Sequence, residues 1–137
     1  MAVVEQLLRS ESNGNISFGN YELPQKEKLD GFEHSGDIYK VKTHQAMTKL
    51  EKNGLFLYES VPGTAVFDFC ENESGMSFTV HGNQDVQITI GAEDDTEYDI
   101  VVSGEKAGTV KTNLSGKLNV SVELEGISEA AVEIVKK

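Results

Sequence analysis

Hydrophobic and polar residues alternate regularly in the second half of the chain. Between residues 64 and 135, seven short segments place apolar side chains at every second position, with turn residues between them. A period of two gives each segment one face toward a core and one face toward water. Segments of this kind, separated by turns every eight to twelve residues, are typical of an antiparallel β-sandwich. We therefore predict an all-β fold with about seven strands in residues 64–137.

The apolar residues that share a face within these segments form the predicted core. Because the chain has no tryptophan, valine, isoleucine, leucine and the six phenylalanines must fill it. The predicted stripes are Ala65, Phe67 and Phe69; Met76, Phe78 and Val80; Val86, Ile88 and Ile90; Tyr98, Ile100 and Val102; Leu118, Val120, Val122 and Leu124; and Val132 with Ile134.

The first 63 residues are less regular, and we interpret them as an N-terminal set of β-hairpins that packs on the sandwich. The apolar positions within residues 3–8 fit either a short helix or an edge strand. Residues 15–18 and 21–23 flank Gly19-Asn20, a two-residue turn. Residues 25–36 are polar and contain two glycines, so we expect a connection there.

The segment at residues 43–53 admits two interpretations. Its apolar residues have the spacing of a helix, with Gly54 as the closing residue. Alternatively, Asn53-Gly54 is the turn of a hairpin that joins residues 48–52 to residues 55–59. Since Asn-Gly between alternating segments is the strongest short hairpin signal, we favour the hairpin.

Acidic residues outnumber basic residues, mostly in the second half of the chain. The formal net charge is -11; residues 1–63 carry nine acids and seven bases, whereas residues 64–137 carry fourteen acids and five bases. Such a surface repels phosphate groups, so we expect neither nucleic acid nor an anionic membrane as a partner. The acidity itself is ordinary for a soluble protein.

The location of the protein is expected to be cytoplasmic. The N-terminal segment is too short and too interrupted for a secretory signal, and no apolar stretch approaches the roughly 20 residues of a membrane span. The single cysteine, Cys70, has no partner for an intramolecular disulfide. It follows a predicted strand, where a small buried thiol is expected rather than a nucleophile.

Two segments resemble known sandwich domains, and the resemblance covers about residues 86–135. Residues 91–101, GAEDDTEYDIV, resemble the T-x-Y entry into a strand of fibronectin type III-like sandwiches. Residues 103–118 resemble the closing strands of small C-terminal sandwiches on polysaccharide-processing enzymes. The resemblance implies that Tyr98 has a structural role, with its ring at a sheet corner and its hydroxyl tied to upstream backbone.

The whole chain also resembles a group of short proteins of anaerobic Gram-positive bacteria, some of which carry the label endosialidase. Sialidases generally bind the sialate carboxylate through several arginines, and their catalytic domains are several times longer. Because Arg9 is the single arginine of this chain, the resemblance does not imply sialidase activity.

Four aromatic residues outside the predicted stripes are the candidate ligand-binding set: Tyr21, Tyr39, Phe56 and Tyr58. Phe56 and Tyr58 share one face of their segment, while leucines occupy the other. A strand that is apolar on both faces is buried on both or meets a partner. We therefore expect these rings to pack on the sandwich or in a subunit interface. If the rings instead lie exposed in a groove, they provide flat faces on which a sugar can stack. The absence of tryptophan, which has the largest such face, counts against this alternative.

The acidic segment with Glu93, Asp94, Asp95 and Glu97 is the candidate metal site. Calcium takes six to eight oxygen ligands, which a weak surface site of this kind can supply in part. The segment lacks the ligand spacing and central glycine of an EF-hand loop, so a solvated turn is favoured over calcium binding. No other cofactor is expected.

No motif in the sequence indicates catalysis. His34, His44 and His81 stand alone, without a second histidine or cysteine at metal-ligand spacing. A hydrolase needs one of them within hydrogen-bond reach of a carboxylate in a cleft. Asp68 interrupts an apolar run, but strand alternation explains it, with Phe67 on the buried face.

The sequence therefore favours a non-enzymatic binding or assembly module, of unknown ligand, that self-associates as a homo-oligomer through its N-terminal region. The alternative is a carbohydrate-binding module with a glycan as its partner, which rests on the C-terminal resemblance. A small hydrolase is the third hypothesis.

Overall fold

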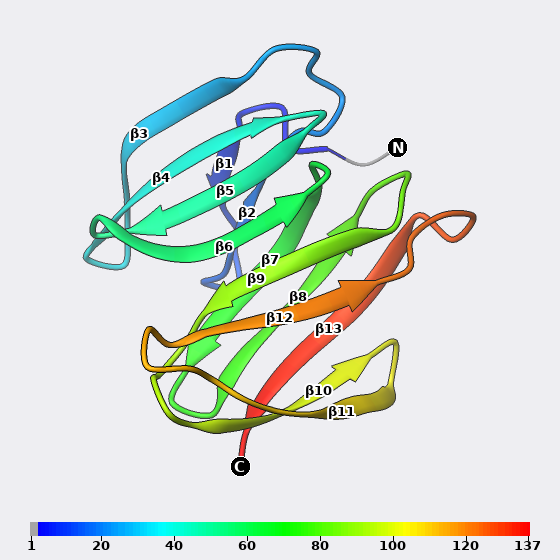
Figure 1. The fold of residues 1–137 in the computed structure, drawn as a ribbon. Coiled ribbons are helices and arrows are strands. Elements are labelled where there is room, and N and C mark those ends of the chain that lie inside the picture. The colour runs from blue at the N-terminus through cyan, green and yellow to red at the C-terminus, as the bar shows by residue number, and fades with distance from the viewer. Residues whose placement is uncertain (1–2) are drawn as a thin grey trace.

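A computed structural model describes residues 3–137 as two antiparallel β-sheets packed face to face (Figure 1). One sheet has seven strands in the order β1-β2-β7-β8-β13-β10-β11, and the other has six in the order β12-β9-β6-β5-β4-β3. The predicted all-β sandwich is confirmed. The strands are β1 (Leu8–Ser10), β2 (Ile16–Phe18), β3 (Glu27–His34), β4 (Asp37–His44), β5 (Met47–Lys52), β6 (Leu55–Val61), β7 (Ala65–Asn72), β8 (Gly75–His81), β9 (Val86–Gly91), β10 (Glu97–Val102), β11 (Glu105–Lys111), β12 (Lys117–Val122) and β13 (Glu129–Lys136).

Strands from the first 63 residues and strands from the remainder share both sheets. Residues 64–137 contain seven strands, β7 to β13. In the six-stranded sheet β6 pairs with β9, where Tyr58 lies opposite Ile90. In the seven-stranded sheet β2 pairs with β7. These pairings show where the two parts of the chain meet, and the division at residue 63 itself stays a prediction.

The ambiguous segment at residues 43–53 forms a hairpin, as favoured from the sequence. Strands β5 and β6 pair with Lys52 opposite Leu55, and Asn53 and Gly54 form the turn between them. Both turn residues have positive φ angles, +52° and +79°. Two successive positive φ angles match the right-handed twist of the flanking strands, which is why Asn-Gly is favoured there.

The prediction that Gly19-Asn20 joins two strands of a hairpin is wrong, because residues 21–23 form no strand. Strand β2 pairs instead with β1 and β7. Gly19 passes against the β6–β7 connection so closely that a Cβ atom would lie 2.4 Å from the carbonyl oxygen of Thr64. The glycine thus permits a close approach to another segment rather than a reversal of the chain.

The predicted connection at residues 25–36 is also wrong, because strand β3 occupies most of it. Strand β3 is an edge strand that pairs with β4, and a register shift interrupts the pairing between Leu29 and Phe32. Leu29 and Phe32 are the apolar side chains of this strand that pack against the core. The shift breaks the period of two, so the sequence pattern of this strand is polar and irregular.

A β-bulge in β7 changes which phenylalanines are buried. Asp68 has a positive φ of +56°, and the pairing with β8 shifts register between Phe67 and Cys70. As a result Val66 and Phe69 point into the core, whereas Phe67 lies on the outer side under the Arg9 guanidinium, 5.5 Å from its ring centroid. The expectation that Phe67 faces the core is therefore wrong, since a bulge reverses alternation beyond it.

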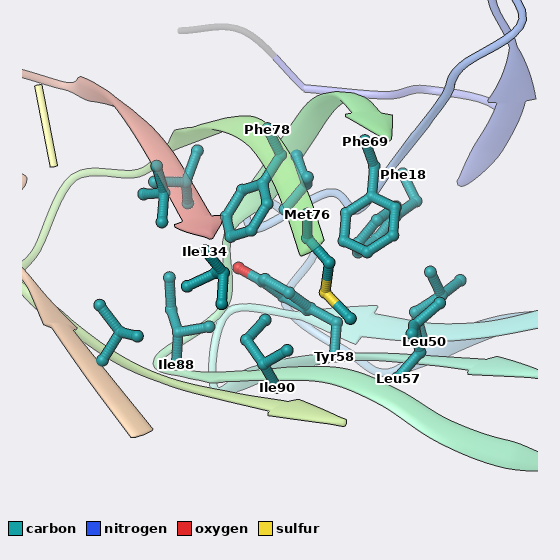
Figure 2. Packing of buried hydrophobic residues seen from close by; sticks show 14 of the residues in the cluster. Phe18, Leu50, Leu57, Tyr58, Phe69, Met76, Phe78, Ile88, Ile90 and Ile134 are labelled. Carbon is teal, nitrogen blue, oxygen red and sulfur yellow. The ribbon is translucent and has the colours of Figure 1, made fainter. Parts of the chain in front are cut away.

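Four aromatic rings form the centre of the core between the two sheets (Figure 2). Phe18 lies edge-on to Tyr58 and Phe69, with ring centroids 5.2 and 5.8 Å away. Phe78 stacks on Phe69 at 5.6 Å and meets Tyr58 edge-on at 5.7 Å. Such offset and edge-to-face arrangements add to the stabilisation from burial alone.

Buried hydroxyl groups connect β4, β5 and β6 to the start of β7. Thr48 donates its hydroxyl hydrogen to the carbonyl oxygen of Thr64 at 2.9 Å and accepts the Thr64 N–H at 3.1 Å. The hydroxyl of Thr43 lies 2.8 Å from that of Thr48 and must be the donor, since Thr48 has only one hydrogen. The Thr64 hydroxyl in turn lies 2.8 Å from those of Tyr58 and Ser60.

We expect Tyr58→Phe to lower the free energy of unfolding by about 1–2 kcal/mol, because it removes one buried hydrogen bond of this hydroxyl cluster. Tyr21→Phe is the matched control. The Tyr21 hydroxyl is buried but has no hydrogen-bond partner among residues 3–137, so its removal should leave stability unchanged or increase it. Urea unfolding of both variants tests this difference, and equal losses for the two contradict it.

Candidate functional site

A groove of about 820 Å³ opens between the two sheets at one end of the sandwich. It lies where the β5–β6, β7–β8, β9–β10 and β11–β12 turns meet the end of β13, so both sheets contribute walls. We call it the end groove. Its apolar lining residues are Leu55, Phe56, Leu57, Met76, Ala92, Tyr98 and Ile134, and its charged ones are Lys52, Lys117, Lys136, Glu71, Glu73 and Glu93.

The floor of the end groove consists of side chains that belong to the core. Leu57, Met76, Tyr98 and Ile134 line it and are all buried. Leu57 lies at a register shift between β5 and β6, which allows it and its neighbour Tyr58 both to be buried. In Figure 2, Met76 and Ile134 lie beside Tyr58 between the two sheets. The floor therefore presents an apolar surface on a rigid scaffold.

Ion pairs on the rim join segments across the end groove. The Lys52 ammonium on β5 lies 2.9 Å from a carboxylate oxygen of Glu71 on β7 and 3.7 Å from Asp37. Lys136 on β13 pairs with Glu93. The hydrogen bonds to these glutamates raise the pKa of Lys52 and of Lys136 above the usual value. Two of the three rim lysines are thus engaged by carboxylates.

The third rim lysine, Lys117, lies over an aromatic ring instead. Its ammonium nitrogen is 4.8 Å from the ring centroid of Phe56, and that of Lys49 is 5.9 Å from the same centroid. Phe56 lies against Gly91, where a Cβ atom would come within 2.3 Å of the Phe56 carbonyl oxygen. Gly91 pairs with Lys117 on the next strand, so the ring and the lysine are neighbours across three strands.

The structure separates the four aromatic residues of the predicted ligand-binding set. Tyr58 is in the core with 0% of its surface exposed, and Tyr21 and Tyr39 are 4% and 8% exposed. Burial raises the pKa of each of these tyrosines. Phe56 alone lines the end groove. The three tyrosines therefore offer no open ring faces to a sugar.

A second, polar hollow of about 420 Å³ is lined by Tyr21, Glu22, Gln45, Asn83 and Gln84. It lies at the end of the sandwich opposite the end groove, where β4 turns into β5 and β8 turns into β9. Its lining is mostly amide and carboxylate, so it lacks the apolar walls of the end groove.

The acidic segment between β9 and β10 is a turn held by hydrogen bonds. Glu93 and Asp95 pair with lysines, and the Asp95 carboxylate lies 3.2 Å from the Lys111 ammonium. The buried Tyr98 accepts a hydrogen bond from the Glu93 N–H at 3.2 Å through its hydroxyl oxygen. Within residues 3–137, no three or more His, Cys, Asp and Glu side chains gather as metal ligands. Calcium binding by Glu93, Asp94, Asp95 and Glu97 stays a prediction from the sequence.

The three histidines lie outside both hollows. His34 Nε2 lies 2.9 Å from the carbonyl oxygen of Gly14, which can only accept, so Nε2 carries a hydrogen; Nδ1 lies 2.8 Å from the Ser10 hydroxyl oxygen. His81 lies 3.5 Å from a Glu129 carboxylate oxygen, and burial lowers its pKa. The thiol residue Cys70 is half-buried.

The sequence did not reveal the end groove because its residues fall into two ordinary classes: apolar residues of the predicted core stripes and charged residues beside turns. Met76 and Ile134 were predicted as core residues, which is correct. The alternation of apolar and polar residues does not show which end of a core stripe lies beside a groove. Lys52 and Lys117 border turns, where charged residues are common. The one usable signal was Phe56, which fits neither a stripe nor a turn.

Comparison of the chain with protein-family models, with curated proteins and with solved structures gave no match. In residues 3–137 there is no helix with the length and apolar character needed to cross a membrane. The function proposed below therefore rests on the geometry of the end groove.

Proposed function

We propose that this protein is a non-enzymatic binding module that takes a small molecule with an apolar body into the end groove. The single observation that supports this function is a groove with a buried apolar floor and a charged rim. Its volume of about 820 Å³ lies within the range of small-molecule pockets, which are mostly apolar with a few placed polar groups.

The energetics of the floor favour an apolar ligand. Covering apolar surface contributes roughly 25 cal/mol for each Å² removed from water, so a ligand gains affinity by burying its own apolar body and by covering the exposed Leu55 and the half-buried Phe56 and Ala92. The floor residues are fixed by core packing, which limits the entropy that binding costs.

The proposal differs from self-association through Phe56 and Tyr58. Tyr58 is fully buried between the sheets, so Tyr58→Ser would destabilise the sandwich itself, and loss of an oligomer in this variant would not identify an interface. Phe56 lines the end groove, where a ligand covers it without a second copy of the chain. Self-association and glycan binding stay separate hypotheses, which size-exclusion chromatography and a glycan-binding panel test.

The proposal is tested by fluorescence titration with the neutral apolar probe N-phenyl-1-naphthylamine. Ala92→Trp fills the groove with a large side chain, since Ala92 lines it and packs partly against the core. Leu114→Trp is the matched control, because Leu114 is 85% exposed and does not line the groove. We expect saturable binding to the native chain and to Leu114→Trp, and a loss of about tenfold or more in Ala92→Trp.

Two results count against the binding module. One is an absence of saturable binding to the native chain. The other is unchanged affinity in an Ala92→Trp variant whose circular dichroism and unfolding curve are native.

A further inference from the structure

We propose that the polar hollow opposite the end groove binds a neutral saccharide, which it holds by hydrogen bonds alone. The hollow has a volume of about 420 Å³ and is lined by Tyr21, Glu22, Gln45, Asn83 and Gln84. This volume lies near the lower end of the range for small-molecule pockets, roughly 300–1,000 Å³, which suits a mono- or disaccharide better than a long chain. The inference concerns a second site and does not depend on the proposed function of the end groove.

The first argument is the chemistry of the lining, which consists of three carboxamides, one carboxylate and one phenol. Each carboxamide both donates and accepts hydrogen bonds, the carboxylate accepts them, and the phenol hydroxyl can do either. A ligand that matches this set must donate and accept at several atoms, as the hydroxyl groups of a sugar do. Within residues 3–137, no lysine, arginine or histidine lines the hollow, and the net charge of the chain is -11, so an anionic ligand is disfavoured.

The second argument is that the hollow offers little apolar surface to a ligand. Among residues 3–137, Tyr21 supplies the one aromatic ring of the lining, and this residue is only 4% exposed. A nucleobase or an alkyl chain gains much of its affinity by stacking on a ring or by covering apolar surface. The hollow therefore favours a ligand with many hydroxyl groups over a flat or an apolar one.

The third argument is the Tyr21 hydroxyl, which is buried and has no hydrogen-bond partner among residues 3–137. Such groups are rare in folded proteins, because a buried hydroxyl without a partner has lost its bonds to water and gained none in return. Tyr21 lines the hollow, so a ligand hydroxyl that enters there can complete the missing bond. A sugar hydroxyl can do so either as donor or as acceptor.

The fourth argument is that hydrogen bonds fix the backbone of the turns that line the hollow. In the β4–β5 turn, Gln45 donates its N–H to the carbonyl oxygen of Leu23 and accepts the N–H of Gly63, both at 2.9 Å. In the β8–β9 turn, the carboxylate of Asp85, next to Gln84, accepts two backbone N–H groups of the β12–β13 connection at 2.9 and 3.0 Å. Because these backbones are already ordered, a ligand has only side chains to order when it binds.

The test is a ¹⁵N–¹H NMR titration of the native chain with the neutral sugars glucose, maltose, cellobiose and lactose, up to their solubility limits. Because the contacts are hydrogen bonds to side chains at the surface, we expect millimolar affinity. At least one neutral sugar should give saturable shifts that cluster on the amides of Gln45, Asn83 and Gln84. Glucosamine and glucuronate, which add a positive and a negative charge to the glucose ring, should bind less tightly than that sugar.

Two variants test whether the sugar contacts the lining. Tyr21→Phe removes the buried hydroxyl, a change that is expected above to cost no stability, and it should weaken the tightest neutral sugar by about fivefold through the loss of one hydrogen bond. Asn83→Ala should cause a similar loss. Asn119→Ala is the matched control, because Asn119 is exposed on β12 outside the hollow, and it should leave the affinity unchanged.

Saturable shifts at the hollow that weaken in Tyr21→Phe and in Asn83→Ala support the inference. It is wrong if no neutral sugar gives saturable shifts on these amides, or if glucosamine or glucuronate binds more tightly than every neutral sugar. It is also wrong if Tyr21→Phe and Asn83→Ala bind the sugar as tightly as Asn119→Ala does. These outcomes leave the end groove untouched, because its function is tested with an apolar probe at the other end of the sandwich.

Discussion

Phe18→Ala is expected to lower the free energy of unfolding by about 3–5 kcal/mol, the range measured for a large aromatic removed from a tight core. Phe18 is fully buried on the short strand β2 and contacts both Tyr58 of the six-stranded sheet and Phe69 of the seven-stranded one. Its loss leaves a cavity at the point where the two sheets meet. Since domains of this size are stable by only about 5–15 kcal/mol, a large fraction of the molecules should unfold at moderate urea concentrations.

Phe32→Ala is the control for this prediction. Phe32 lies on the edge strand β3 and is only partly buried against the core, so its truncation should cost clearly less. Equilibrium urea unfolding followed by circular dichroism measures both losses. A loss for Phe18→Ala no larger than that for Phe32→Ala would mean that Phe18 is not at the centre of the core.

Gly75→Ala is expected to destabilise the protein by about 3 kcal/mol or more, because it combines a strained backbone angle with a clash. Gly75 begins strand β8 with a φ of +131°. A Cβ atom at this position would lie 1.8 Å from the carbonyl oxygen of Ile134, which is backbone of the neighbouring strand β13 and cannot move aside. The β8–β13 pairing must shift to relieve the contact, and the floor of the end groove must shift with it.

Gly108→Ala separates the cost of the backbone angle from the cost of the clash. Gly108 also has a positive φ, +156°, but no atom lies within 4 Å of the position of an added Cβ. We expect this variant to lose only about 1 kcal/mol, the cost of the backbone angle. Thermal unfolding of the two variants provides the comparison, and a similar small loss in both would show that β8 and β13 do not approach as closely as described.

The alternating segments of the sequence predicted most of the fold because their pattern depends only on which face of a strand is buried. The stripe at Val86, Ile88 and Ile90, for example, is buried at every position. The Asn53-Gly54 turn was predictable for the same reason, since two positive φ angles are a local requirement. Requirements of this kind depend on residues that are adjacent in the sequence, so the local pattern of residue types predicts them.

The parts that the sequence did not predict are those that depend on other segments. Strand β3 has a polar pattern, and its place in the sheet comes from pairing with β4 and not from a buried face of its own. The bulge at Asp68 is stabilised by contacts from 51 and 55 residues away, where Ser17 accepts the Asp68 N–H and Asn13 donates to its carboxylate. The local alternation of apolar and polar residues gives no indication of contacts with such distant residues.

The end groove could not be predicted for a related reason. It forms where four turns and the end of β13 meet, and its floor residues satisfy the same alternation as the closed part of the core. Whether a stripe ends under a neighbouring loop or opens to solvent depends on loop geometry in three dimensions. Phe56 was recognised as unusual from the sequence, but its neighbours Gly91 and Lys117 were not.

The central claim is that a small apolar molecule binds in the end groove, and a ¹⁵N–¹H NMR titration with N-phenyl-1-naphthylamine tests it most directly. The account predicts saturable shifts that cluster on the amides of Phe56, Met76 and Lys117, and no shifts at Asn83 and Gln84 in the opposite, polar hollow. Shifts confined to the polar hollow, or no shifts at probe concentrations up to its solubility limit, would contradict the account.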